Sequence, residues 1–115
     1  MTPVSVATSS PSRSADAPVQ VAVQHRADRL EIHVHGEVDI AAHDLLADQL
    51  TAVDLSGVTA VDLRLAELDF CDSYGVRQLL DFADAARRTG CTVGLLDARP
   101  QLARLIALID TSTAA

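Results

Sequence analysis

The stretch Val61-Asp-Leu-Arg-Leu-Ala-Glu-Leu-Asp-Phe-Cys-Asp-Ser-Tyr-Gly-Val-Arg-Gln-Leu-Leu80 decides the fold, because the period of its apolar residues changes midway. In its first part Val61, Leu63 and Leu65 alternate with polar residues, which is typical of a half-buried strand. Farther on, the apolar residues take the spacing of one helical face, at Val76, Leu79, Leu80, Ala83 and Ala86. The stretch therefore predicts a strand, a short turn and a helix that ends at Thr89-Gly90.

Asp72 and Ser73 stand immediately before the amphipathic run, and either residue type can cap a helix. The first backbone N–H groups of a helix have no partner within the helix. A hydroxyl placed beside them lies where an anion such as phosphate is favoured.

The segment Phe70-Cys-Asp-Ser-Tyr-Gly-Val-Arg-Gln-Leu-Leu80 resembles the phosphorylation-site motif of STAS domains, and more narrowly that of bacterial anti-sigma factor antagonists. Gly36-Glu-Val-Asp39 is similar to the second signature of that family. The two motifs occur in the family's order, and the resemblance runs from about Val21 to about Asp110. It implies an α/β fold, a single STAS-like domain with a small mixed sheet and helices packed on it.

The resemblance also implies a function, in which Ser73 is phosphorylated by a partner kinase. In this family the unphosphorylated antagonist binds an anti-sigma factor with serine kinase activity and frees a sigma factor; phosphorylation weakens the complex and a serine phosphatase resets it. The partner-binding residues implied here are Glu37, Asp39, Asp72, Ser73, Tyr74, Gly75 and Arg77. A weak homodimer is a further expectation.

Purely structural interpretations also remain open for these residues. Ser73 could be only a helix cap, and Asp39 only an acid at a helix start, favoured there by the helix dipole. The alternative function is a phosphorylation-independent STAS scaffold, or an accessory subunit of a signalling or transport complex; a small-ligand sensor is a weaker one. Two residues depart from the family pattern, Tyr74 beside the phosphorylation site and Arg64 in the strand, and both bear on the choice of partner.

The rest of the chain supplies the remaining elements. Alternation over 19–24 and 30–35, around a polar turn at 25–29, predicts a β-hairpin. Gly36 predicts a tight bend, followed by a helix from about 41 to 53. Residues 92–96 read as a strand buried on both sides, and Pro100 begins a helix with a buried stripe at Leu102, Leu105, Ile106 and Ile109. Residues 1–18 are expected to be a flexible tail, 19–110 the STAS domain and 111–115 a frayed end.

Composition limits the classes of function. The 115 residues suit one domain, and a core of Leu, Val, Ile and Ala follows from one Tyr, two Phe and no Trp. A net charge of -7 argues against direct binding of nucleic acid or of an anionic membrane surface. The absence of a membrane-length apolar run or a signal peptide predicts a cytoplasmic protein without membrane insertion. Cys71 and Cys91 are expected to be reduced thiols.

The sequence predicts no catalytic residues, no metal and no cofactor. Ser73 lacks the Gly-x-Ser-x-Gly elbow of serine hydrolases, and neither a P-loop nor a dinucleotide fingerprint is present. The pair His33 and His35 shares one strand face without evident further ligands, so histidines that are solvated or covered by a helix are expected. Asp62, Asp69 and Asp72 could be imagined as an acidic cluster, but Asp62 fits an exposed strand face and Asp72 a cap.

Overall fold

The structure is a computed structural model that describes residues 17–114, with side chains described for residues 17–110. Most of the expected N-terminal tail, residues 1–16, lies outside the described residues. Within the rest, the chain runs in the order β2 Val19–Arg26, β3 Arg29–Val38, the 3-10 helix η1 Ile40–Ala42, α2 His43–Thr51, β4 Ala60–Arg64, β5 Leu68–Cys71, α3 Ser73–Arg88, β6 Thr92–Leu96 and α4 Pro100–Ala114. The last helix thus extends into the stretch for which we expected fraying.

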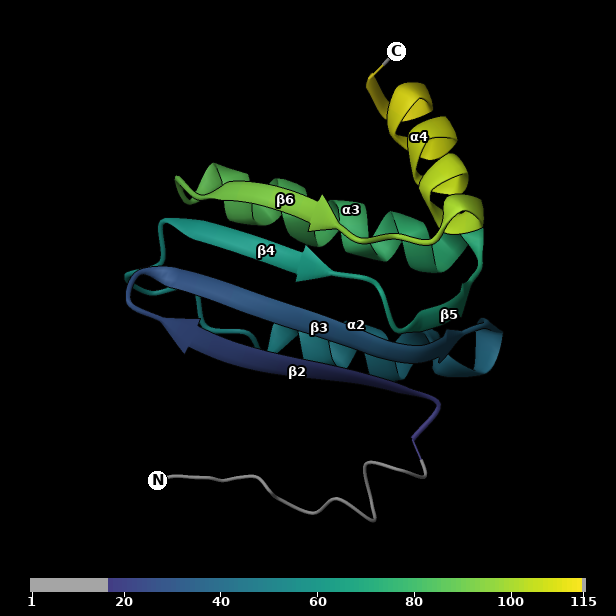
Figure 1. Cartoon of the computed structure of the whole chain (residues 1–115), viewed down its shortest axis with the longest axis horizontal. Helices are drawn as coiled ribbons and strands as arrows, with labels where there is room; N and C mark the ends of the chain where they lie inside the picture. Colours follow the sequence, from purple (N-terminus) through teal and green to yellow (C-terminus); the bar gives the residue numbers. More distant parts are fainter. Residues whose placement is uncertain (1–16, 115) are drawn as a thin grey trace.

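The strands form one mixed five-stranded sheet in the order β2-β3-β4-β6, with β5 also paired to β3 (Figure 1). β2 and β3 are antiparallel and joined by a two-residue turn, since Arg26 pairs with Arg29. All other pairs are parallel. The predicted hairpin and the predicted mixed sheet are both confirmed.

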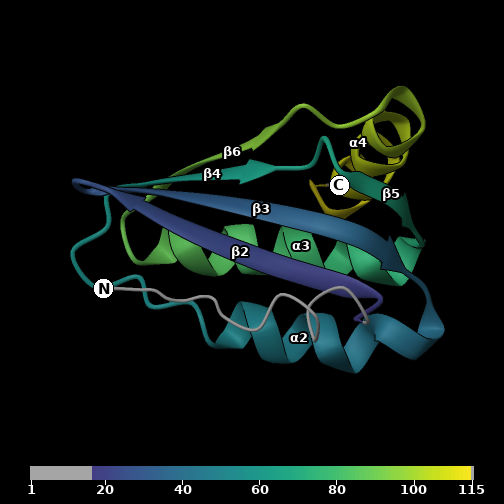
Figure 2. The same ribbon diagram turned by 60° about the horizontal axis from the view of Figure 1, so that its bottom comes forward.

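Helices α2 and α3 lie side by side against one face of the sheet (Figure 2). The opposite face carries polar side chains, including Glu31, His33 and His35. His33 Nε2 lies 3.4 Å from a carboxylate oxygen of Glu31, and His35 Nδ1 lies 2.7 Å from one of Glu67. Both histidines therefore contact carboxylates on the solvent-facing side of the sheet, and no group of three ligands suited to a metal occurs among residues 17–110.

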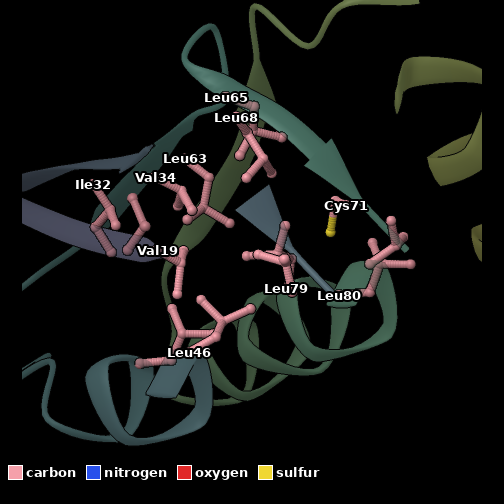
Figure 3. Close-up of a cluster of buried hydrophobic side chains, with 14 of the residues drawn as sticks. Val19, Ile32, Val34, Leu46, Leu63, Leu65, Leu68, Cys71, Leu79 and Leu80 are labelled. Carbon is pink, nitrogen blue, oxygen red and sulfur yellow. The ribbon is translucent and has the colours of Figure 1, made fainter. Parts of the chain in front are cut away.

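The core lies between the sheet and the two helices (Figure 3). Its largest fully buried side chains are all aliphatic: Leu30, Ile32, Leu46, Leu63, Leu65, Leu68, Leu79, Val19, Val34, Val38, Val61 and Val76. Each such side chain contributes roughly 2 kcal/mol when it leaves water. The five α3 residues predicted to form one apolar face are all buried. The change of period within Val61–Leu80 thus correctly predicts which face of the strand and which face of the helix are buried against each other.

Three details differ from the sequence-based expectation. β3 continues past Gly36 to Val38, because Gly36 forms a bulge at φ +106° instead of ending the strand. A Cβ on Gly36 would collide with the carbonyl oxygen of Pro18, so the bulge needs glycine there. β5 was not expected at all. β6 is an edge strand whose residues are half-buried or exposed, since it pairs only with β4 and is not buried on both sides.

Candidate functional site

The candidate site lies where the C-terminal ends of β3 and β5 meet the first turn of α3. The backbone N–H of Asp72 donates to the carbonyl of Val38 at 3.0 Å, which joins the end of β3 to the start of the helix. Asp72 itself is extended, with φ -77° and ψ 175°, and α3 begins at the next residue. The upstream signature and the Ser73 motif are therefore brought together in space, as Val38 also pairs with Cys71.

Asp72, and not Ser73, caps α3. Its Oδ1 accepts a hydrogen bond from the backbone N–H of Gly75 at 2.8 Å. Ser73 is the first helical residue and is exposed. Within the described part of the chain, its hydroxyl makes no side-chain hydrogen bond. The two capping alternatives that the sequence left open are thus resolved, and the serine hydroxyl is free for another role.

A histidine from another helix completes this turn. His43 Nε2 lies 2.9 Å from both carboxylate oxygens of Asp72, and its ring stacks on Tyr74 with centroids 4.3 Å apart. Gln78 Nε2 donates to the backbone carbonyl of His43 at 2.9 Å. These contacts fix the start of α2 against the first turns of α3. Sequence reasoning missed His43, because no local pattern relates it to a residue 29 positions away.

The electrostatics of Asp72 and Cys71 follow from these contacts. Burial of the Asp72 carboxylate opposes ionisation, but hydrogen bonds from the Gly75 N–H and from His43 outweigh it and lower the pKa of Asp72 below its ordinary value. Asp72 is therefore ionised at neutral pH. Burial, with a smaller contribution from the Asp72 charge, raises the pKa of the Cys71 thiol to about 12. Cys71 is a neutral, buried packing group.

Gly75 is placed where no side chain fits. A Cβ there would lie 2.6 Å from Cγ1 of Val38, 2.7 Å from Sγ of Cys71 and 3.3 Å from Oδ1 of Asp72. Glycine therefore allows the first turn of α3 to approach the ends of β3 and β5. This close approach also brings the Gly75 N–H to the capping carboxylate.

The other predicted site residues lie around the same end of the sheet. Asp39 Oδ1 accepts from the backbone N–H of Ala41 at 3.1 Å, so Asp39 caps η1 and is exposed. Glu37 is exposed and pairs with Phe70 across β3 and β5. Arg77, on the second turn of α3, is half-buried.

Large apolar side chains are exposed here, a signal that sequence reasoning did not use. Ile40 is 84% exposed, Tyr74 59% and Phe70 52%. We call these three residues, with Asp39 and Ser73, the Ser73 surface. They lie at or next to the paired ends of β3 and β5 and the start of α3, and exposed apolar groups in such a region are typical of a protein interaction site.

The geometry is unlike that of a hydrolase. Both close contacts of His43 Nε2 are to Asp72, and no histidine among residues 17–110 hydrogen-bonds the Ser73 hydroxyl. Asp69 is paired with Arg99 at 3.0 Å and Asp62 with Arg29 at 2.8 Å, so the three aspartates do not gather into one cluster.

Arg64, one of the two departures from the family pattern, pairs with Asp97 at 2.9 Å. No described helix is long and apolar enough to cross a bilayer.

Comparison with known structures identifies the fold. SpoIIAA, an anti-sigma factor antagonist, superposes in its unphosphorylated form with a TM-score of 0.64 and 19% identity, over 83% of each chain. The phosphorylated form of SpoIIAA from Bacillus gives 0.61 and 21% identity, over 83% of this chain and 86% of that one. The five-stranded mixed sheet and its helices are thus the STAS fold, as predicted.

Two larger proteins contain the same fold. The chain superposes on Mglu with a TM-score of 0.59 and 25% identity, over 69% of its own length and 20% of that chain. For the murine anion transporter Slc26a9 the values are 0.62 and 17%, over 74% of this chain and 14% of the transporter. No curated protein sequence matches the chain.

The family model described as "Mlab, STAS domain" matches residues 21–113, most of the chain. This range includes the whole candidate site, from the bulge in β3 to the first turns of α3. The chain belongs to the STAS domain family.

Proposed function

We propose that this STAS domain is an anti-sigma factor antagonist that binds an anti-sigma factor with serine kinase activity, frees a sigma factor, and is switched off by phosphorylation at Ser73. The observation that carries the proposal is the exposed Ser73 hydroxyl at the start of α3, which Asp72 relieves of the capping role. A kinase can reach this hydroxyl without breaking a hydrogen bond that supports the helix.

The surroundings of Ser73 support a protein partner. Ile40, Phe70 and Tyr74 present apolar area to solvent, and aromatic residues of this kind often anchor interfaces. Glu37 and Asp39 add negative charge at the edge of the same surface. We assign partner binding to Glu37, Asp39, Asp72, Ser73, Tyr74, Gly75 and Arg77, with Asp72 and Gly75 acting by shaping the turn.

Phosphorylation would act on the interface and leave the fold intact. A phosphoserine adds roughly -1.5 to -2 charges at neutral pH, and the N-terminus of a helix favours such a charge. Asp72 already places one carboxylate there, held by Gly75 and His43. When a partner covers Ser73, burying the new charge opposite like charge or apolar groups costs several kcal/mol. A serine phosphatase would restore binding.

The protein itself has no catalytic role in this proposal. Its kinase, phosphatase and sigma factor act in the cytoplasm, and we place the protein there with them. SpoIIAA, the antagonist with the same fold, exists in unphosphorylated and phosphorylated forms, which supports a phosphate switch on this scaffold.

A second candidate function is a phosphorylation-independent STAS subunit in a larger assembly. The observation that favours it is the occurrence of the same fold as a small part of an anion transporter. In that case the Ser73 surface would bind a partner without chemistry at the hydroxyl, and Ser73 would be an ordinary exposed residue.

Mass spectrometry of the protein from its native cells distinguishes the phosphorylation switch from the phosphorylation-independent subunit. We expect phosphate on Ser73 and none at that position in Ser73→Ala. Ser73→Asp should weaken binding of the co-purified kinase at least about tenfold, which corresponds to 1.4 kcal/mol. Thr92→Asp is the control, because Thr92 is an exposed residue of β6 whose hydroxyl makes no hydrogen bond within the described residues, and it should bind like wild type. An unmodified Ser73 under growth and stress, with Ser73→Asp binding its partner normally, would refute the phosphorylation switch and favour the second candidate.

A further inference from the structure

A groove of about 490 Å³ lies between β5 and α4, next to the Ser73 surface. We propose that it is a docking site for an acidic amphipathic segment of the protein partner. The proposal deepens the proposed function and rests on it for the identity of that partner. It is carried by three properties of the groove: its apolar walls, its charge and its position.

The groove has an apolar floor and apolar rims. Cys71 and Leu102 are buried at its floor, while Phe70 and Leu108 stand at its rims with 52% and 68% of their surface exposed. Leu105 lies between them and is half-buried. This arrangement suits the insertion of a few apolar side chains from a partner segment.

Helix α4 presents more apolar surface than the core uses. Leu102, Leu105, Ile106 and Ile109 pack against the core, where Leu102 is buried and the other three are only half-buried. A second row at Gln101, Arg104, Leu105 and Leu108 follows the i, i+3, i+4, i+7 spacing of one helical face, and all four of its members line the groove. Figure 1 shows why this face is open: α4 starts beside β5 and then extends away from the sheet. The row spans about 10 Å along the helix.

The charge of the groove selects an acidic occupant. Its charged lining residues are Asp69, Arg99 and Arg104, which leave one excess positive charge on a protein whose net charge is -7. Arg99 is engaged, since it pairs with Asp69 at 3.0 Å and donates to the carbonyl of Ala66 at 3.2 Å. Arg104 has no ion pair or hydrogen bond within the described residues. Arg104 is exposed at the groove wall, where a carboxylate from a partner would form an ion pair with its guanidinium group.

The position of the groove identifies the occupant as part of the same partner. Phe70 belongs both to the groove and to the Ser73 surface, and only Cys71 separates it from the capping Asp72. A protein that covers Ser73 and Tyr74 can therefore extend across Phe70 to Leu105 and Leu108, which line the same groove as Phe70. An amphipathic helix with apolar residues three and four apart and acidic residues at its margin matches the groove.

The first test uses defined probes and the full-length protein. Two matched amphipathic peptides, with the same leucines and either glutamates or lysines, are titrated into isotope-labelled protein and followed by NMR. We expect the acidic peptide to shift the resonances of Phe70, Leu105 and Leu108 saturably, and the basic peptide to bind at least about tenfold more weakly. Arg104→Glu should remove the preference. Arg88→Glu, at an exposed arginine of α3, is the control and should keep it.

Several outcomes would overturn the proposal. These are equal binding of both peptides, binding of neither, or shifts that map outside the groove. Dodecanoate as a third probe separates a small-ligand site from a docking site: if it binds in the groove through Arg104 and the acidic peptide does not, the groove takes small anionic amphiphiles.

The second test uses the serine kinase partner and keeps the two proposals distinguishable. Leu108→Glu, which changes an exposed side chain, should weaken kinase binding about tenfold, whereas Arg88→Glu should not. Wild-type kinase binding by Leu108→Glu and Arg104→Glu, with normal phosphorylation of Ser73, would refute the docking site and leave the proposed function standing. Absence of any Ser73 kinase would refute the proposed function, and the peptide titration would still decide whether the groove accepts acidic segments.

Discussion

Removing the capping carboxylate of α3 should destabilise the protein far more than removing the neighbouring hydroxyl. The perturbations are Asp72→Ala and Ser73→Ala. Asp72 accepts from the Gly75 N–H at 2.8 Å and contacts His43 at 2.9 Å, whereas the Ser73 hydroxyl makes no side-chain hydrogen bond within the described residues. The comparison separates a structural role from a signalling role at adjacent positions.

The magnitude follows from the two Asp72 contacts. Replacing an N-cap aspartate by alanine costs about 1 kcal/mol. The contact with His43 adds roughly 0.5–1 kcal/mol, discounted for solvent screening because the two side chains are 16% and 31% exposed. We therefore expect Asp72→Ala to lower the free energy of unfolding by about 2 kcal/mol, and the melting temperature by roughly 10 °C. Ser73→Ala should change the free energy by less than about 0.5 kcal/mol.

Urea unfolding followed by far-UV circular dichroism measures these differences, since the chain has no Trp to report by fluorescence. Asp72→Asn is a useful intermediate, because asparagine caps helices as well as aspartate but cannot pair as an anion with His43. Its cost should be about half that of Asp72→Ala. If Ser73→Ala proved as damaging as Asp72→Ala, Ser73 would be the cap, and the argument that its hydroxyl is free for phosphorylation would fail.

Four further results are expected. The pKa of Asp72 is lower in the folded protein than in the unfolded chain, so its contribution to the free energy of unfolding is present above the unfolded value of about 3.9 and is lost as the pH falls through the lower folded value. The stabilities of wild type and Asp72→Asn should therefore converge at acid pH. A stability difference that stays constant with pH would contradict this. Gly75→Ala should cost about 2 kcal/mol in urea unfolding, since its Cβ would meet Val38 and Cys71 below 3.0 Å. Burial raises the pKa of the Cys71 thiol to about 12, so iodoacetamide at mildly alkaline pH should modify it only at the rate of global unfolding; rapid labelling of native protein would be inconsistent with that burial. Phosphorylation of Ser73 should leave the circular dichroism spectrum unchanged, and a large loss of helix would show that the phosphate acts on the fold.

Local patterns in the sequence predict most of the fold. The β2–β3 hairpin follows from alternation, and α3 from a 3.6-residue period that begins after a capping residue. β5 escaped prediction because its buried residues, Leu68 and Cys71, are three apart and not two, with Asp69 and Phe70 exposed between them. A strand of four residues with irregular pairing has no alternation to detect.

The candidate site is predictable only in part, since much of it depends on long-range contacts. The motif identifies Ser73, and the upstream signature identifies Asp39. The pair His43 and Asp72 arises only when α2 packs beside α3, and neither residue alone suggests it. The β5–α4 groove likewise depends on the direction that α4 takes after the turn.

The contacts of Asp72 determine how far a phosphate on Ser73 can act. A new dianion at the start of α3 repels the Asp72 carboxylate, but Gly75 holds that carboxylate from within the helix and His43 holds it from α2. Displacing it would break both contacts, at a cost of about 2 kcal/mol, comparable to that of Asp72→Ala. The helix dipole meanwhile favours the phosphate by up to about 1 kcal/mol, so repulsion in solvent of high dielectric is largely offset. The structural change on phosphorylation should therefore remain within the first turn of α3. The added charge should act mainly on the binding of the protein that covers Tyr74 and Phe70.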